Sequence, residues 1–188
     1  MAADVELPLR AIATALPGVQ ILEPTVHRDT RGFFLESYRA DQLAEIGIHS
    51  TFVQDNHSRS VARTLRGLHW QWRRPQAKLI RVVAGAIFDV VVDIRRGSAT
   101  FGRWVGVNLS SDDFRQLYVP VGFAHGFCVL SEAADIEYKC TDYYDPAGEG
   151  GLRWDDPFVG IDWPVSDPIL SRRDAEHPPF GPNRSDLL

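Results

Sequence analysis

The sequence predicts a mainly β domain in which two antiparallel sheets face each other. Glycine or proline turn signals recur at short intervals, and the runs between them are rich in Val, Ile, Phe, Tyr and Trp. Several of these runs alternate apolar and polar residues, which is the period of a half-buried strand. Many short strands at nearly regular spacing are typical of a sandwich or barrel.

The individual elements follow in chain order. Residues 40–46 are the one segment of the first half that is patterned like a helix, and Asp41 could cap its N-terminus. Residues 88–94 and 104–109 come next, and in both the apolar side chains occupy every second position. Such side chains share one face of a strand. A second, short helical turn is predicted over residues 171–175.

The length of 188 residues suits a single domain, residues 1–188, with one sizeable core. Residues 176–188 hold three prolines and little hydrophobic patterning. We therefore expect this C-terminal tail to lie over the surface of the domain.

Charge and composition exclude several classes of protein. The net charge of −5 does not provide the basic surface that nucleic-acid binding requires. The longest clean apolar stretch, residues 82–88, is too short to span a membrane. The N-terminus, with Asp4 and Glu6, lacks the basic start of a signal peptide. Cys128 and Cys140 fit buried free thiols of a reducing compartment, so we predict a cytoplasmic protein.

Three of the side chains could carry chemistry. His69 lies within a strand-like run framed by aromatic residues, and His125 lies in a run bounded by glycines. Tyr138 falls on one face of a predicted strand. Each could equally be a core side chain whose polar atoms are satisfied. The remaining histidines among polar or loop residues are predicted to be surface residues; these are His27, His49 and His177.

A metal site is one alternative, because β sandwiches of the cupin type often bind one. Such a site needs several histidines and a carboxylate that converge. The usual signature places a second histidine two residues after the first, but Gln71 stands at that spacing from His69. The sequence therefore predicts no metal.

A series of short motifs runs through the chain in a fixed order. They are residues 29–38 (DTRGFFLESY), 52–58 (FVQDNHS), 65–69 (LRGLH), 78–81 (KLIR), 88–95 (FDVVVDIR), 122–127 (GFAHGF), 138–141 (YKCT), 143–144 (YY), 162–164 (DWP) and 170–174 (LSRRD). In content and spacing, the chain resembles the dTDP-4-dehydrorhamnose 3,5-epimerase family over nearly its whole length.

This resemblance implies a cupin jelly roll, a homodimer and an isomerase that needs no cofactor. The implied reaction converts dTDP-4-dehydro-6-deoxy-D-glucose to dTDP-4-dehydro-L-rhamnose, in dTDP-L-rhamnose biosynthesis, by inverting C3 and C5. By resemblance, His69 is the general base, Asp174 orients it and Tyr138 is the general acid. Lys78 would lie near the sugar ketone. The implied substrate-binding residues are Arg31, Phe33, Glu36, Gln54, Asn56, Arg66, His125, Tyr144, which would stack on the thymine, Glu149 and Arg173.

Two features depart from simple expectation. Arg173 stands where the family often has lysine, and the two cations bind ligands with different geometry. Strict alternation would also put Arg66 and His69 on opposite faces of their strand. For both to reach one ligand, Gly67 must introduce a bulge, or Arg66 must precede the strand.

The residue types suit proton transfer beside a ketone. Removal of the C–H proton places negative charge on the ketone oxygen, so the site needs a base and a nearby cation. An imidazole has an ordinary pKa of about 6.5 and a phenol one of about 10, which fits a base and an acid at neutral pH. The substrate's own ketone accepts the electron pair, so no cofactor is required.

The sequence leaves three other functions open. A relative that inverts only C3 or only C5 would share the base and the acid. A non-catalytic cupin that binds a sugar nucleotide would need neither. A metal-dependent cupin isomerase or dioxygenase would need the second histidine that Gln71 replaces.

Overall fold

The structure, a computed structural model, describes residues 9–188 and contains two large antiparallel sheets. The first sheet has six strands in the order β1-β2-β10-β7-β12-β5. Their bounds are β1 Leu9–Ala13, β2 Gln20–Pro24, β10 Gln116–Val119, β7 Lys78–Ala84, β12 Ala133–Cys140 and β5 Gln54–Val61. Neighbouring strands are mostly distant in sequence, so the chain crosses repeatedly between the sheets.

The second sheet has five strands in the order β13-β6-β11-β8-β9. Their bounds are β13 Glu149–Gly151, which follows a 3-10 turn over Pro146–Gly148, β6 Leu65–Gln71, β11 Phe123–Val129, β8 Ala86–Asp93 and β9 Trp104–Ser110. Apolar side chains from both sheets meet in one buried cluster that includes Ile80, Leu117, Val91 and Phe127. The predicted mainly β fold with two facing sheets is confirmed.

The two alternating segments differ in what they pack against. Residues 105, 107 and 109 of β9 turn their apolar side chains into the cluster between the sheets. Val90 and Val92 of β8 instead pack on the outer side of the second sheet, in a separate cluster with Phe180 and Leu187. Strand β8 is therefore buried on both faces, and the expectation of a half-buried strand is wrong there because the C-terminal segment covers its second face.

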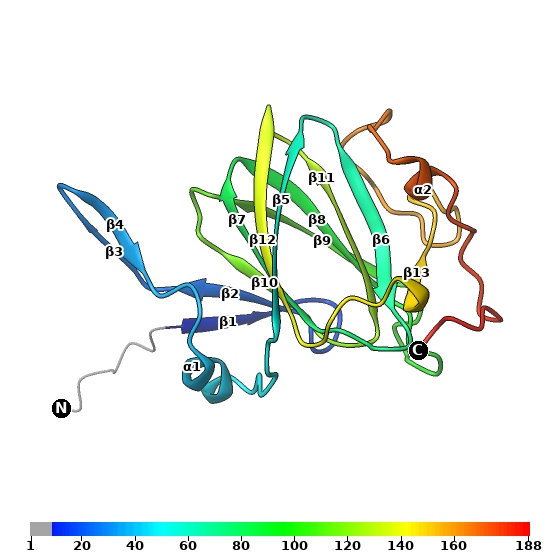
Figure 1. The fold of residues 1–188 in the computed structure, drawn as a ribbon, viewed down its shortest axis with the longest axis horizontal. Coiled ribbons are helices and arrows are strands. Elements are labelled where there is room, and N and C mark those ends of the chain that lie inside the picture. Colours follow the sequence, from blue (N-terminus) through cyan, green and yellow to red (C-terminus); the bar gives the residue numbers. More distant parts are fainter. Residues whose placement is uncertain (1–8) are drawn as a thin grey trace.

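Two short helices lie at opposite ends of the fold (Figure 1). Helix α1 covers Ala40–Glu45, as predicted, but Asp41 does not cap it. The N-cap residue is Arg39, which has no side-chain capping bond, and Asp41 lies inside the first turn as the ion-pair partner of Arg39. Helix α2 covers Arg172–Ala175, where Ser171 is the N-cap and accepts a hydrogen bond from the backbone N–H of Asp174.

The C-terminal tail, residues 176–188, runs along the outside of the second sheet (Figure 1). It is more firmly docked than a surface tail, because Phe180 and Leu187 are buried in the outer cluster. The indole N–H of Trp70 also donates to the carbonyl of Asp186. The tail therefore covers the outer face of β6.

Strands β3 (Val26–Asp29) and β4 (Gly32–Leu35) form a separate hairpin that projects from the opposite end of the molecule (Figure 1). Phe33 and Phe34 on this hairpin are 57% and 65% exposed. The expectation about the extreme N-terminus rests on Asp4 and Glu6, which lie outside the described residues. In residues 9–188, no helix is long and apolar enough to cross a membrane.

Candidate active site

A cleft of about 420 Å³ opens between the two sheets, next to β5 and β6. Side chains of both sheets line it, together with residues of the C-terminal segment. The predicted residues that line the cleft are His69, Tyr138, Lys78, Asp174, Gln54, Asn56, Arg66, His125, Tyr144, Glu149 and Arg173. The structure therefore brings all four predicted catalytic residues to one place.

Strand β6 delivers both Arg66 and His69 to this cleft because it is irregular at Gly67. Its pairing with β11 matches His125 to His69 but Phe127 to Arg66, so one strand advances three residues while the other advances two. Gly67 has a φ of 118°, which favours glycine, and a Cβ there would lie 2.6 Å from the Cα of Gly126. Of the two arrangements expected, the structure has the bulge at Gly67, since Arg66 lies within the strand.

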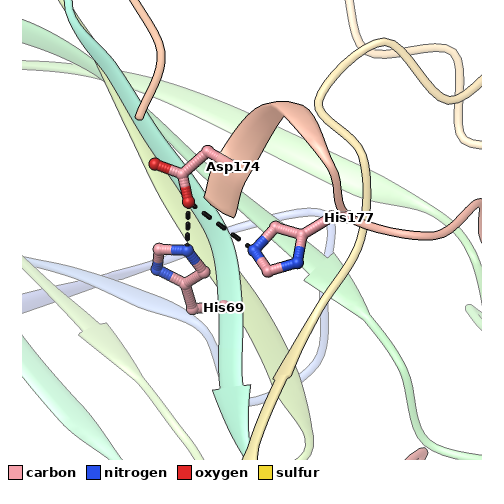
Figure 2. Close-up of side chains that lie close together, drawn as sticks. All are labelled: His69, Asp174 and His177. Carbon is pink, nitrogen blue, oxygen red and sulfur yellow. Dashed lines mark hydrogen bonds and ion pairs between the residues drawn. The ribbon is translucent and has the colours of Figure 1, made fainter. Parts of the chain in front are cut away.

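His69 and Asp174 form a close pair (Figure 2). The distance between Nε2 of His69 and Oδ1 of Asp174 is 2.6 Å, and the hydroxyl of Ser171 donates to Oδ2 of Asp174 at 2.8 Å. Burial by itself raises the pKa of Asp174, but His177, His69 and Ser171 together hold that pKa well below its usual value. An ionised carboxylate only accepts hydrogen bonds, so Nε2 of His69 carries the proton. Its Nδ1 has no hydrogen-bond partner in the described part of the chain and is the basic nitrogen.

Burial lowers the pKa of His69, and the nearby Lys78 ammonium acts in the same direction, while the Asp174 carboxylate opposes both. The imidazole is therefore neutral at pH 7 and able to accept a proton. Its side chain is 19% exposed, so its ring can exchange protons with the cleft.

Tyr138 approaches the cleft from the facing sheet. It lies on β12, opposite Asn56 of β5 and Ile80 of β7. Burial raises the pKa of its phenol, which therefore keeps its proton at neutral pH. The cleft thus has a basic group on one sheet and an acidic group on the other.

Lys78 begins β7, and burial lowers the pKa of its ammonium group. The nearby Cys140 thiol receives a hydrogen bond from the amide of Asn56 at 3.6 Å. Both cysteines are free and buried, as the sequence predicted.

His125, which lines the cleft, forms a second histidine–carboxylate pair with a buried aspartate behind it. Nε2 of His125 lies 2.9 and 3.0 Å from the two carboxylate oxygens of Asp89. Asp89 lies on β8 and is completely buried. This pair is held between two neighbouring strands, β11 and β8.

Polar side chains join at the mouth of the cleft. The hydroxyl of Tyr144 donates to Glu149 at 2.9 Å, and Arg173 donates to the same carboxylate oxygen at 2.5 Å. The side-chain oxygen of Gln54 accepts from the backbone N–H of Tyr144. Arg173 thus reaches the mouth of the cleft, although the family often has lysine there.

Three of the predicted substrate-binding residues lie elsewhere in this chain. Arg31 and Phe33 are on the projecting hairpin β3–β4, and Glu36 follows it and contacts Arg39 and Gln42. None of the three lines the cleft described above.

Sequence reasoning missed two residues near His69. Ser171 donates a hydrogen bond to the carboxylate of Asp174, and a serine three residues before an aspartate is a readable capping signal. His177 was expected at the surface, but its side chain is only 11% exposed and packs beside Asp174 and His69. That prediction is wrong, because the docked tail encloses the ring. His27 and His49 are exposed, as expected.

The family model described as dTDP-4-dehydrorhamnose 3,5-epimerase matches residues 13–181. A relative of that name from Salmonella typhimurium is 55% identical over 170 residues, which cover 89% of this chain and 93% of the relative. Another of that name, from Neisseria gonorrhoeae, is 54% identical over 164 residues, which cover 87% of this chain. The matched region spans only 50% of that relative's length.

A solved structure of an epimerase is also similar to this chain. The dTDP-6-deoxy-D-glucose-3,5-epimerase of Legionella pneumophila, crystallised in complex with dTDP-4-keto-L-rhamnose, is 51% identical to this chain. It superposes with a TM-score of 0.87 and covers 89% of this chain and 90% of its own. By its sequence, fold and matched length, this chain belongs to the dTDP-4-dehydrorhamnose 3,5-epimerase family.

Proposed function

We propose that this chain catalyses the epimerisation of dTDP-4-dehydro-6-deoxy-D-glucose at C3 and C5, which yields dTDP-4-dehydro-L-rhamnose. The observation that carries the proposal is the placement of His69 and Tyr138 on facing sheets around one cleft. A base and an acid on opposite sides of a sugar ring are what inversion at carbon requires. The named relatives act on the same class of sugar nucleotide.

In the first step, Nδ1 of His69 removes the proton from the carbon beside the ketone. The C–H bonding electrons form an enolate, and the Lys78 side chain stabilises the charge on its oxygen. Asp174 stabilises the imidazolium that forms, as the carboxylate does in other histidine–carboxylate pairs. General base catalysis of this kind contributes about 10² to 10⁴ in rate.

In the second step, Tyr138 donates its phenol proton to the opposite face of the same carbon. The carbon is inverted, and the ketone is restored. Solvent then returns a proton to Tyr138 and takes one from His69, so the enzyme regains its starting state. Repetition at the second carbon completes the double epimerisation, and no electron leaves the substrate.

The nucleotide part of the substrate would occupy the mouth of the cleft. Arg66 and Arg173 present guanidinium groups, which bind phosphate oxygens through paired hydrogen bonds. Tyr144 is 47% exposed and can stack on the thymine. The polar side chains of Gln54 and Asn56 line the same wall.

The protein acts as a homodimer in this proposal, because one chain leaves part of the predicted site unused. The hairpin that carries Arg31 and Phe33 projects from the end of the molecule opposite β6 and α2 (Figure 1), and neither residue lines the cleft. We infer that these two residues and Glu36 complete the cleft of a second copy. Mixing inactive Arg31→Ala and His69→Ala chains would then restore up to about a quarter of the activity by forming one intact site per mixed dimer. No recovery after subunit exchange would contradict this arrangement.

The central test is incubation with dTDP-4-dehydro-6-deoxy-D-glucose in deuterium oxide, followed by NMR. The wild type should incorporate deuterium at C3 and C5 and give the L-rhamno product, whereas a single-position epimerase would invert only one carbon. His69→Ala should abolish exchange, and Tyr138→Phe should lose inversion while it remains folded by circular dichroism. Normal exchange in His69→Ala would remove this residue from the role of base. Exhaustive chelation should leave the rate unchanged.

A further inference from the structure

Two histidines and one aspartate, residue types that can bind metal ions, converge next to one another: His69, Asp174 and His177 (Figure 2). Nε2 of His69 lies 2.6 Å from Oδ1 of Asp174, and Nε2 of His177 lies 3.6 Å from the same oxygen. One donor atom from each residue lies within 4.8 Å of the other two. The three donors come from β6, from α2 and from the docked tail.

Nε2 of His177 is buried and has no hydrogen-bond partner among residues 9–188. A buried polar atom without a partner loses its hydrogen bonds to water and gains none in return, so its position needs an explanation. The 3.6 Å separation from Asp174 is too long for a good hydrogen bond. The nitrogen is therefore directed at the His69–Asp174 pair without being satisfied by it.

The surroundings fix the ring of His177 in this position. A Cβ at Gly151 would lie 2.2 Å from Cε1 of His177, so the absence of a side chain there makes room for the ring. The ring packs edge-on against that of His69, with 5.3 Å between their centres. The next residue, Pro178, accepts a backbone hydrogen bond from Arg153.

We propose that His69, Asp174 and His177 form a binding site for a zinc-like transition-metal ion, which inhibits the enzyme when it is bound. Two imidazole nitrogens and one carboxylate oxygen make up a common three-residue zinc set, in which a fourth position stays open. Tetrahedral bonds of about 2.0–2.2 Å place ligand atoms about 3.3 Å apart. The separations of 2.6 and 3.6 Å lie on either side of that value.

Inhibition follows from the tautomer of His69, and this step rests on the proposed function. A metal ion on Nε2 needs the lone pair that the Nε2 proton now occupies. A neutral ring that gives Nε2 to the metal carries its proton on Nδ1 instead. Nδ1 then has no lone pair for the substrate's proton, so abstraction beside the ketone stops.

The ligand set also predicts which ions bind. Imidazole nitrogen suits Zn²⁺, Co²⁺, Ni²⁺ and Cu²⁺, whereas Mg²⁺ and Ca²⁺ prefer sites made only of oxygen ligands. The inhibitory site is therefore compatible with a reaction that needs no metal. Chelation should relieve inhibition rather than remove a cofactor.

Isothermal titration of chelator-treated full-length protein with Zn²⁺ tests the site, with Mg²⁺ as the comparison ion. The wild type should bind one Zn²⁺ per chain and ignore Mg²⁺. His177→Asn, whose shorter side chain cannot reach the pair, should bind Zn²⁺ at least about tenfold more weakly. His57→Asn is the matched control, because His57 also lies near two carboxylates, Asp135 at 3.1 Å and Glu137 at 3.8 Å, but is exposed. Its affinity for Zn²⁺ should equal that of the wild type.

A wild-type crystal soaked in Zn²⁺ provides a measurement that does not depend on a variant. An anomalous peak between the three side chains is expected, and a peak elsewhere, or equal affinity in His177→Asn, would overturn the inference. Deuterium exchange, compared with each protein's own metal-free rate, should be inhibited by Zn²⁺ in the wild type and His57→Asn at concentrations that spare His177→Asn. Zinc bound at the three residues without inhibition would instead contradict the proposed role of His69 as base.

Discussion

The two histidine–aspartate pairs of the cleft are neighbours, yet they are built differently. His69 and His125 are paired residues on the adjacent strands β6 and β11. Asp174 reaches His69 from a short C-terminal helix, whereas Asp89 binds His125 from the neighbouring strand β8. The His69 side chain is 19% exposed and that of His125 is 9% exposed.

In the proposed mechanism, this difference in exposure separates a pair that exchanges protons from a pair that is held fixed. A base must return its proton to solvent in every turnover, which favours the more accessible ring. Both carboxylate oxygens of Asp89 are within hydrogen-bond distance of Nε2 of His125, so that ring is held in a single orientation. A fixed ring suits a group that positions the substrate.

The largest effect is expected when the carboxylate of the His69 pair is replaced by an amide. In Asp174→Asn, the amide can donate to Nε2 of His69 and leave the proton on Nδ1, where it blocks proton abstraction. We expect kcat to fall by about 10⁴ without loss of fold, as for the corresponding change in a serine-protease triad. Steady-state kinetics and circular dichroism measure the two quantities.

Asp89→Asn is the matched variant in the second pair. It should raise KM and reduce the free energy of unfolding in urea, because it disturbs a completely buried pair. Its kcat should fall much less than that of Asp174→Asn. An equal loss of kcat in the two variants would contradict the division of roles between the pairs.

The next largest effect is expected at the Gly67 bulge of β6, the strand that places His69 beside His125. In Gly67→Ala, the new Cβ would lie 2.6 Å from the Cα of Gly126, at a φ of 118°. We expect a loss of about 3 kcal/mol in unfolding free energy, from backbone strain and overpacking together. Gly97→Ala is the control: φ is 81° there, and no atom lies within 4 Å of a Cβ, so it should lose about 1 kcal/mol. Similar losses in both variants would mean that close packing at Gly67 contributes nothing.

The sequence predicted the features of the fold that depend on neighbouring residues, and it missed those that depend on packing between distant segments. The β class followed from alternation, and a bulge at Gly67 was one of two ways to place Arg66 and His69 on one side. The apolar face of residues 88–94 was predicted, but its partner, the C-terminal tail, was not, because the tail has no periodic pattern. The cap of helix α1 was misplaced because Asp41 pairs with Arg39 instead.

The site was predicted through motifs rather than through spacing. His69 and Asp174 are 105 residues apart, and only the family resemblance linked them before the fold was known. His177 was missed because burial of a loop histidine depends on how the tail docks. Arg31, Phe33 and Glu36 stay predictions, since their proposed place lies in a second chain.

The smallest effect is expected at a third buried carboxylate, Asp93, which lies on β8 four residues after Asp89 and has no histidine. Burial by itself raises the pKa of Asp93, but hydrogen bonds from Arg95, Ser98 and Thr100 lower it to about 2. Because the folded-state pKa lies below the usual 3.8, the ionised group stabilises the fold above about pH 4, and this contribution is lost as the pH falls through 2.

A shift of this size corresponds to about 2 kcal/mol. In urea unfolding, the stability of the wild type relative to Asp93→Asn should therefore fall by about that amount between pH 5 and pH 2. A difference that does not change with pH would mean that Asp93 has the same pKa in the folded and unfolded states. Asp93 would then stabilise the loop after β8 through its hydrogen bonds alone. The negative charge of this buried carboxylate would contribute nothing to the stability of the fold.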